Sequence, residues 1–314
     1  MCQRITFAVL LTLMACALSG CFFTGVENTG NISDKEIQRA MTDLERRQPT
    51  SSIKLLHADS VPVWRSGKRF YVTDDQLRYI LTPANVNVID TASLEGRELA
   101  FTHYDTQGDG LDLRNTVNLH FTLDGVEYIY RTSKMLGDFT AAYSVPLLID
   151  IDMVDDMAAQ LVGREMYIKT PIWYNIDNGT MFKGRQYILV HIDSVKPGNK
   201  VLPLCVEFTA RDNGQKAMVW MSSPLAVMHN RDFDSLFSLI DLHTLYPHID
   251  ATTWNRIINS EVAENMTKEA CRLALGMPKQ VNQVPDPSGM REYWYYDDGR
   301  FLQFVDGLLK SYRK

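Results

Sequence analysis

The residues with the clearest potential for chemistry are the aspartates between residues 105 and 112. Asp105, Asp109 and Asp112 are interspersed with Gly108 and Gly110, and this mixture of carboxylates and glycines is what calcium-binding loops require. The segment lacks the regular Asp-x-Asp-x-Asp-Gly spacing and the closing glutamate of an EF-hand loop. A hairpin tip rich in glycine and aspartate explains the same residues. We therefore predict no cofactor and keep the three aspartates as the alternative, a metal-binding loop.

No catalytic motif accompanies these aspartates. The chain contains no Cys-x-x-Cys, His-Glu-x-x-His or Gly-x-Ser-x-Gly sequence and no glycine-rich phosphate loop. His103, His120 and His191 lie in or beside segments that alternate like strands, and their spacings do not resemble a zinc site. We expect these histidines to be solvated or hydrogen-bonded, and we predict that the protein is not an enzyme.

The N-terminus carries a targeting signal, which we place at residues 1–20. Arg4 supplies a positive charge, and an apolar run of signal-peptide length follows it. The sequence LSGC at residues 18–21 resembles a bacterial lipobox, which implies cleavage before Cys21 and acylation of that residue. Several acyl chains anchor a protein stably, because each buried methylene contributes about 0.8 kcal/mol. An ordinary cleaved signal or a short membrane helix is the alternative. Phe22, with no acidic residue beside it, favours the outer membrane and a body that faces the periplasm.

The composition is that of an ordinary globular protein. The chain has 314 residues, of which 45% are hydrophobic and 22% charged, so two or three domains with sizeable cores are expected. Its net charge of −6 argues against nucleic acid or an anionic membrane surface as a partner. Of five cysteines, three fall within the first twenty-one residues. The other two, Cys205 and Cys271, form either one disulfide in an oxidising compartment or, in the favoured alternative, two small buried thiols.

The middle of the chain has the pattern of β-strands. Short runs of Val, Ile, Tyr, Phe and Thr are separated by Gly, Asn and Asp. Two halves look alike, because Gly-Arg followed by alternating apolar residues recurs, as does a Phe-Thr strand before a glycine-bearing turn. We predict an internal repeat, with one β-rich unit at residues 52–143 and a linker helix plus a second unit at residues 144–224. Each unit is expected to be a small antiparallel sheet or barrel of about five strands, with hairpin turns at Asp124-Gly125 and Asn213-Gly214.

Helical periodicity borders these units. Residues 21–51 are predicted to be a polar tether followed by a short charged helix. Methionine and leucine recur every four residues up to residue 161, after an acidic start, and predict the linker helix. Residues 225–262 are predicted to form a bracket of two helices, the first from about residue 232 to residue 246. The larger aromatic residues of the β-rich region are expected in cores or along a groove: Trp64, Trp173, Tyr174 and Trp220.

The last fifty residues predict one helix followed by paired strands. Thr267 is placed to cap the helix, Gly276 to end it, and Pro278 to prevent its continuation. Asp298-Gly299 and Asp306-Gly307 mark two tight turns. Strand alternation directs one set of side chains to each face of the sheet: Trp294, Tyr296, Leu302 and Phe304 to one, and Tyr293, Tyr295, Phe301 and Gln303 to the other.

The same stretch resembles the SmpA/OmlA (BamE-like) lipoprotein family. The resemblance covers about residues 250–314 and is carried by NMTKEACRLALGMP at residues 265–278, by WYY at residues 294–296 and by GRFLQFVDGLL at residues 299–309. It implies a helix-plus-three-stranded antiparallel sheet module at residues 263–314, as in β-lactamase inhibitor proteins. It also implies a part in assembling outer-membrane β-barrels. The chain departs from the family pattern at residue 265, where asparagine replaces the usual glycine. Asparagine also tolerates the left-handed conformation.

These patterns predict a multi-domain α+β lipoprotein of a Gram-negative-type cell envelope. We expect a non-enzymatic protein-binding or scaffold module that serves outer-membrane or envelope assembly or maintenance. Its expected partners are the lipid bilayer, through Cys21, and other envelope proteins, but no nucleic acid. The alternative is an enzyme or ligand-binding lipoprotein that acts on envelope glycans or peptides at a site between the two β-rich units. A structural spacer is a third reading. Four residues of the last module are the candidate partner-binding set: Trp294, Tyr296, Arg300 and Phe304.

Overall fold

The computed structural model describes residue 53 and residues 59–85, 92–107, 115–225, 231–287 and 289–313. This part of the chain is strand-rich, with several antiparallel sheets and short helices, so the α+β class is confirmed. It divides into two compact units, a larger one that ends at Glu261 and a smaller one that begins at Val262. The signal peptide, Cys21, the tether helix, Asp109 and Asp112 lie outside the described residues, so the predictions made on them stay predictions.

The first sheet of the larger unit has the strand order β2-β5-β4-β3-β1-β6, and all its pairs are antiparallel. The expected hairpin turn joins β4 to β5, with positive φ at Asp124 and Gly125. Short 3-10 helices precede β1, precede β2 and follow β5: η1 (Val61–Val63), η2 (Asp75–Tyr79) and η3 (Leu136–Asp138). The strands are β1 (Arg69–Val72), β2 (Leu81–Pro83), β3 (Glu98–Gln107), β4 (Thr116–Leu123), β5 (Val126–Met135) and β6 (Leu148–Asp150).

The second sheet of the same unit has the order β13-β7-β10-β11-β12-β8-β9. Its strands are β7 (Glu165–Ile168), β8 (Ile172–Tyr174), β9 (Met181–Lys183), β10 (Ile188–Pro197), β11 (Leu204–Ala210), β12 (Lys216–Met221) and β13 (Phe237–Ser238). If β8 and β9 are counted as one position and the second order is read from its β9 end, the chain fills the positions of both sheets in the same succession. The register is interrupted after Phe101 in β3 and after Ile192 in β10, which hold equivalent positions. The first sheet has six strands and the second seven, where about five were expected, because strands of two or three residues are too short to show alternation.

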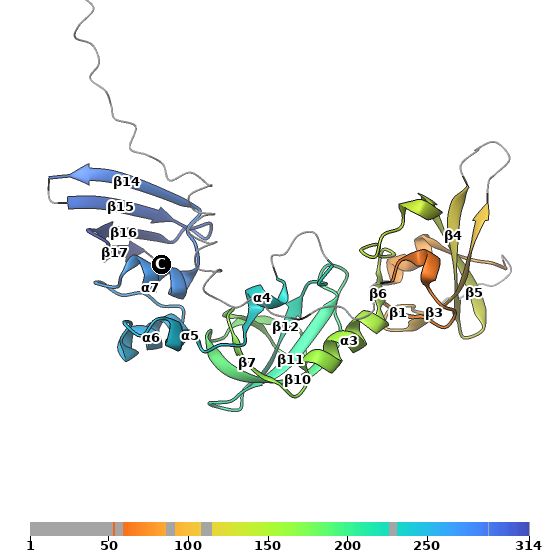
Figure 1. Ribbon diagram of the computed structural model, residues 1–314, viewed down its shortest axis with the longest axis horizontal. Helices are drawn as coiled ribbons and strands as arrows, with labels where there is room; N and C mark the ends of the chain where they lie inside the picture. Colours follow the sequence, from red (N-terminus) through yellow and green to blue (C-terminus); the bar gives the residue numbers. More distant parts are fainter. Residues whose placement is uncertain are drawn as a thin grey trace, which may run out of the picture. The chain divides into compact units, whose positions relative to one another are not determined.

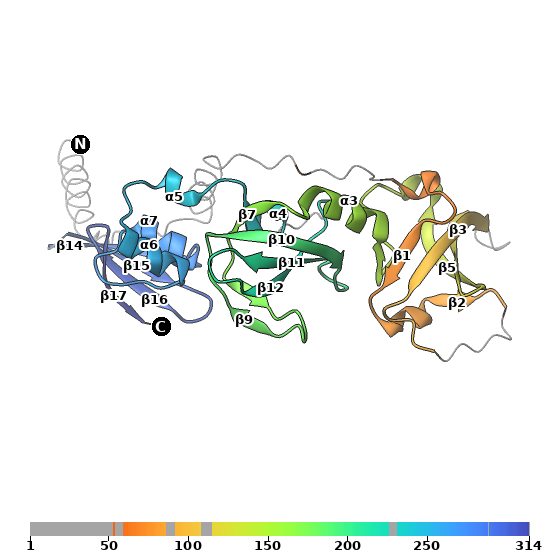
Figure 2. The same ribbon diagram turned by 90° about the horizontal axis from the view of Figure 1, so that it is seen from below.

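Helix α3 (Ile151–Leu161) lies between the two sheets along the chain and packs against β10 of the second (Figures 1 and 2). The side chain of Asp150 caps it by accepting a 3.0 Å hydrogen bond from the backbone N–H of Asp152. Met153, Met157 and Leu161 are buried in the core of the second sheet. The four-residue spacing and the acidic start therefore predicted this helix correctly.

Each sheet has its own aromatic core. In the first, Phe101 and Phe121 meet edge to face at 5.9 Å and are both buried. In the second, Trp173 is fully buried and meets Phe208 at 5.0 Å. Gly184 lies directly beneath the indole, so that a Cβ atom there would come within 2.1 Å of Trp173 Cδ2. The absence of a side chain at residue 184 is thus a packing requirement.

The expected first bracket helix is wrong. Two single-turn helices, α4 (Phe233–Leu236) and α5 (Leu242–Leu245), flank the short strand β13 instead. The reason is tertiary: Phe237 pairs with Ile168 of β7 and is buried, which a continuous helix would prevent. The second bracket helix is present as α6 (Ala251–Ile258), which the side chain of Asp250 caps.

The smaller unit consists of α7 (Lys268–Leu275) packed on a sheet of four strands, not three. The strands follow in order: β14 (Gln280–Asp286), β15 (Gly289–Tyr295), β16 (Phe301–Val305) and β17 (Leu308–Arg313). The unexpected strand is β14, whose Pro285 would argue against a central strand. Because β14 is an edge strand, the missing N–H of the proline removes no needed ladder bond.

The caps and turns of the smaller unit follow the sequence. Thr267 accepts a 3.2 Å hydrogen bond from the N–H of Ala270 and begins α7, and Gly276 ends it with φ +80°. Asn265, where the family pattern has glycine, has φ +67°, so asparagine does adopt the left-handed conformation there. In the part of the chain that the structure describes, no helix is long and apolar enough to span a membrane.

Candidate functional site

The larger unit contains a cavity of about 650 Å³. Ligand-binding cavities in proteins typically measure about 300–1,000 Å³. The lining is mainly apolar and comes from both sheets: β1, the chain before and into α3, the β10–β11 loop and the segment after β12. Its larger apolar side chains include Trp64, Phe70, Val145, Leu148, Met153 and Leu202.

The β10–β11 loop reaches the cavity because it is folded tightly on itself. Asn199 Oδ1 accepts hydrogen bonds of 2.9 Å from the N–H groups of Val201 and Leu202. Gly198 permits this turn, since a Cβ there would lie 2.1 Å from the Leu202 carbonyl oxygen. Lys200 Nζ then lies 3.2 Å from Asp74 Oδ2, which ties this loop of the second sheet to the chain following β1.

Arg231 and Ser222 are among the polar residues that line the cavity. Backbone bonding holds them together, because the N–H of Ser222 donates to the Arg231 carbonyl over 2.8 Å. Arg231 Nε donates to the Trp220 carbonyl over 2.8 Å, and its guanidinium lies 6.0 Å from the ring centre of Tyr174. Arg231 Nη2 and Ser222 Oγ are buried, and neither has a hydrogen-bond partner among the described residues.

These two unpaired groups suit an anionic ligand group. A buried polar atom without a partner costs about 1–3 kcal/mol, more when it is charged. Burial lowers the pKa of the Arg231 guanidinium, because the charged form is poorly solvated there. A carboxylate or phosphate that displaced the atoms covering Arg231 Nη2 would accept from it and compensate the charge, and the planar guanidinium favours such groups geometrically. The apolar lining would receive the remainder of the ligand.

Two other titratable groups of the cavity lining are constrained by their neighbours. Asp150 is engaged by Lys68, whose Nζ lies 2.8 Å from its carboxylate. Tyr143 has a pKa raised above its usual value by burial and by neighbouring Tyr130, so its hydroxyl stays neutral.

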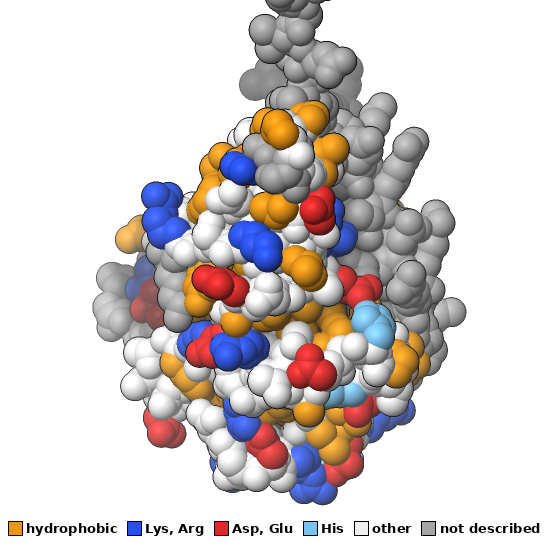
Figure 3. Space-filling view, turned by 90° about the vertical axis from the view of Figure 1, so that its left-hand side faces the viewer, with side chains coloured by type: hydrophobic (Ala, Val, Ile, Leu, Met, Phe, Trp, Pro, Cys, Tyr) orange, Lys and Arg blue, Asp and Glu red, His pale blue; other side chains and the backbone are white. Residues whose placement is uncertain are grey.

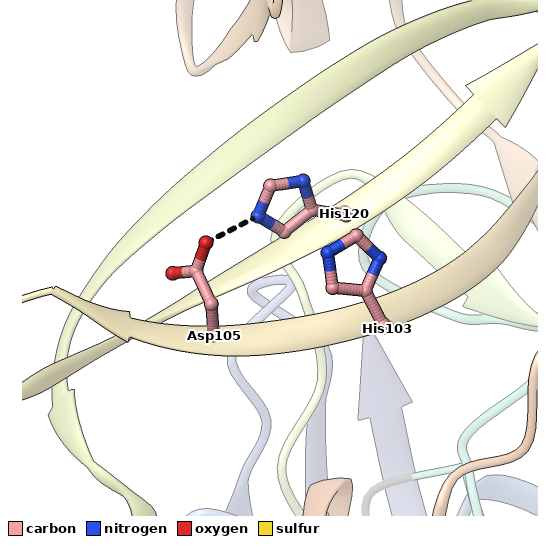
Figure 4. Close-up of side chains that lie close together, drawn as sticks. All are labelled: His103, Asp105 and His120. Carbon is pink, nitrogen blue, oxygen red and sulfur yellow. Dashed lines mark hydrogen bonds and ion pairs between the residues drawn. The ribbon is translucent and has the colours of Figure 1, made fainter.

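Of the three aspartates of the alternative metal-binding loop, Asp105 is the one that lies in the described residues. It lies on β3, where one carboxylate oxygen accepts a 2.8 Å hydrogen bond from Asn118 Nδ2. The other oxygen lies 3.0 Å from His120 Nε2 (Figure 4). The structure therefore brings Asp105 beside His103 and His120, which the spacing analysis had set aside. Strand registers decide which residues meet, and the sequence spacing of these three did not reveal them.

The candidate partner-binding residues of the smaller unit require a correction. Trp294, Tyr296 and Phe304 are 2%, 8% and 0% exposed and form its core. Arg300 is paired with Asp298 over 2.7 Å and lies over the Tyr296 ring at 5.0 Å. Alternation was correctly predicted, but the face that includes these three aromatic residues is the one covered by α7. Arg272 of α7, for example, lies 5.6 Å from the Trp294 ring. They cannot contact a partner without unfolding this core.

The opposite face of the same sheet holds the accessible aromatic side chains. Tyr293 stacks on Phe301 with ring centres 5.9 Å apart, and Phe301 also meets Tyr295, which is 39% exposed. The surface view in Figure 3 shows hydrophobic side chains interspersed with charged ones of both signs. The exposed hydrophobic residues of the smaller unit also include Val284, Met290, Leu308 and Tyr312.

The two remaining cysteines do not pair. Cys205 and Cys271 are free and buried, which is the alternative that the sequence favoured. Burial raises the pKa of each thiol to about 12, so neither is a reactive thiolate at neutral pH.

Comparison with known proteins identifies no relative: no family model, curated protein or solved structure matches the chain. The resemblance of the C-terminal stretch to the BamE-like family is therefore neither supported nor contradicted by these comparisons.

Proposed function

We propose that this chain is a lipid-anchored protein of the bacterial envelope whose larger unit binds a small amphipathic molecule with an anionic group. The observation that carries the proposal is the apolar cavity with two buried, unpaired polar groups, Arg231 Nη2 and Ser222 Oγ. Ligand sites are typically apolar concavities with a small number of convergent polar groups. The proposal keeps the ligand-binding part of the alternative drawn from the sequence, with a small amphipathic anion in place of the envelope glycans or peptides expected there.

The envelope setting of the proposal rests on the sequence. The lipobox-like LSGC at residues 18–21 supports an acylated Cys21, and Phe22 supports the outer membrane and a periplasmic body. The shared connectivity of the two sheets supports an internal duplication. A helix on an antiparallel sheet in the smaller unit is compatible with a BamE-like module. An anchored protein that binds amphiphiles would hold its ligand close to the membrane from which such molecules come.

Calorimetric titration with single-chain amphiphiles tests the proposal. Dodecanoate and dodecyl phosphate, each below its critical micelle concentration, are expected to bind more tightly than the uncharged dodecanol. Arg231→Met removes the charged donor, and a hydrogen bond to a charged group contributes about 1.5–3 kcal/mol. We therefore expect the affinity for the anionic probes to fall about 10- to 100-fold, while that for dodecanol changes little.

The matched control is Arg211→Met. Arg211 is half-exposed, pairs with Glu165 over 2.5 Å and does not line the cavity, so its substitution should leave binding unchanged. Circular dichroism establishes that each variant is folded. Equal affinity of the wild type and Arg231→Met for dodecanoate, or no binding of either anionic probe, would contradict the proposal.

A second function is favoured by the surface of the smaller unit. We propose that this unit binds another envelope protein through the exposed aromatic face of Tyr293, Tyr295 and Phe301 or through its edge strand β14. Crosslinking in intact envelopes, followed by purification of the chain, should recover a protein that is lost with Tyr295→Ser and Phe301→Ser. Recovery of no protein partner, or of one insensitive to both substitutions, would count against it.

A further inference from the structure

We propose that His103, Asp105 and His120 form a binding site for a divalent transition-metal ion of the Zn²⁺ type on the first sheet. One ligand atom from each residue lies within 4.8 Å of the others. A set of two imidazole nitrogens and one carboxylate oxygen suits zinc and its neighbours in the first transition series. Calcium and magnesium prefer oxygen ligands alone. None of the three residues lines the cavity described above, so the site is independent of that proposal.

A β-bulge in β3 brings the histidines together. Phe101 pairs with Phe121, but the next pair in the register is His103 with His120, so that Thr102 is the extra residue. Without the bulge, His103 would oppose Leu119 on the core face of the sheet. With it, His103 and Asp105 both lie on the outer face beside His120 (Figure 4).

Hydrogen bonds orient two of the three ligands. His120 Nδ1 lies 2.8 Å from Glu127 Oε1 and Nε2 lies 3.0 Å from Asp105 Oδ2, so a metal ion bound between Nε2 and Asp105 would replace the proton that joins them. A carboxylate behind a histidine ligand is the usual outer-shell arrangement in zinc sites. Asp105 uses one oxygen to accept from Asn118 Nδ2 and has the other 3.0 Å from His120 Nε2. Both ligands are therefore fixed before a metal arrives.

His103 supplies the adjustable ligand. Its ring stacks on that of His120, with centres 4.1 Å apart and planes 19° from parallel. Bonds of about 2.0–2.2 Å in a tetrahedral site place ligand atoms roughly 3.3 Å apart, so the His103 ring must turn toward the other two. It is exposed and can do so. Three protein ligands leave a coordination position for water or for an external ligand.

The second sheet shows what the same bulge looks like without metal ligands. There the register passes from Ile192–Phe208 to Ser194–Glu207. Ser194 Oγ donates to Glu207 over 2.6 Å, and Lys196 pairs with the same carboxylate over 2.6 Å. A hydrogen-bonded ion pair is thus sufficient for the fold at this position. The histidines and aspartate of the first sheet are not needed to hold the bulge, which leaves them available for a ligand.

Isothermal titration of the full chain with ZnSO₄ tests the proposal. We expect one equivalent of Zn²⁺ to bind in the wild type and no heat from CaCl₂. His103→Ser and His120→Gln should each weaken binding at least 10-fold, and Glu127→Gln about 10-fold, since outer-shell partners typically contribute 10- to 100-fold. The control is His191→Ser on β10, whose cross-strand partner is Thr209 and whose substitution should have no effect.

A spectroscopic measurement guards against variants that bind less because they fold poorly. Co²⁺ added to the wild type should give the visible absorption bands of a low-coordinate site. His103→Ser should abolish these bands. Because the His103 side chain is exposed, the same substitution should leave the melting temperature unchanged. The proposal is overturned if Zn²⁺ does not bind, if binding survives His103→Ser undiminished, or if several equivalents bind equally in all variants.

Discussion

Replacing Glu292 by glutamine should destabilise the smaller unit strongly. The Glu292 side chain is 6% exposed, yet its carboxylate serves donors from three directions. One oxygen accepts from Lys268 Nζ over 2.9 Å and from Gln283 Nε2 over 3.0 Å, and the other accepts from Trp294 Nε1. The residue thereby joins α7, β14 and β15 in one network.

The expected loss is about 2–4 kcal/mol in the free energy of unfolding. Glutamine keeps one of the two oxygen atoms and replaces the other by an NH₂ group, which cannot accept from the donors on that side. At least one charge-assisted hydrogen bond, which contributes about 1.5–3 kcal/mol, is therefore lost. Trp294 is 2% exposed, so its N–H cannot turn to water if it loses its partner. Lys268 is 34% exposed and can, which limits the penalty.

The same network makes the contribution of Glu292 depend on pH. Burial by itself would raise the pKa of Glu292, but hydrogen bonds from Lys268, Trp294 and Gln283 outweigh it and hold the pKa below its usual value. A group with a depressed folded-state pKa stabilises above its unfolded pKa and loses that contribution as the pH falls through the folded value. The gap between wild type and Glu292→Gln should therefore be full at pH 7 and shrink below about pH 4.5, the usual value.

Hydrogen exchange of the amides of α7 and β14–β17 at increasing urea concentration, read by mass spectrometry at pH 7 and at pH 3, measures both effects in the smaller unit alone. Glu264→Gln is the matched control, because Glu264 is exposed in the same unit and such substitutions change stability by at most about 0.5 kcal/mol. A loss under 1 kcal/mol at pH 7, or a gap that stays constant down to pH 3, would refute this account of the network.

Two further predictions concern the interior. Gly184→Ala should destabilise the larger unit by about 3 kcal/mol, because its Cβ would lie 2.1 Å from Trp173 Cδ2. A melting curve that matches the wild type would contradict this packing. The control is Gly137→Ala, whose Cβ would have no heavy atom within 4 Å. Cys205 and Cys271, buried with pKa values raised to about 12, should resist iodoacetamide at pH 8 until urea unfolds the chain. Mass spectrometry of the peptides that contain the two cysteines measures the extent of alkylation. Alkylation of the folded chain at the rate of a free thiol would contradict the prediction, because it would show that the cysteines are accessible.

Features decided by neighbouring residues were predicted well. The capping of α7 by Thr267, its end at Gly276 and the left-handed Asn265 each involve a few residues within one turn. The four-residue spacing of α3 and the alternation on β15 and β16 likewise arise from the periodicity of a single element. In such cases the local chain alone contains the whole interaction, so its residue types are sufficient.

Features decided by contacts between distant segments were not predicted. Residues 237–238 look helical but form β13, because pairing with β7 and burial of Phe237 outweigh local propensity. Strand β14 forms despite Pro285 because it lies at an edge. Which face of the C-terminal sheet is buried depends on where α7 packs, and alternation by itself cannot choose between two faces.

Both candidate sites belong to this second class. Arg231 reaches the cavity through its bonds to Trp220 and Ser222, and the apolar lining comes from segments more than a hundred residues apart. His103 meets His120 only because a bulge shifts the register by one residue. The sequence by itself determined the types of these residues and the elements on which they lie. The tertiary structure decided which of them face one another, because register and packing are set by the free energy of the whole fold.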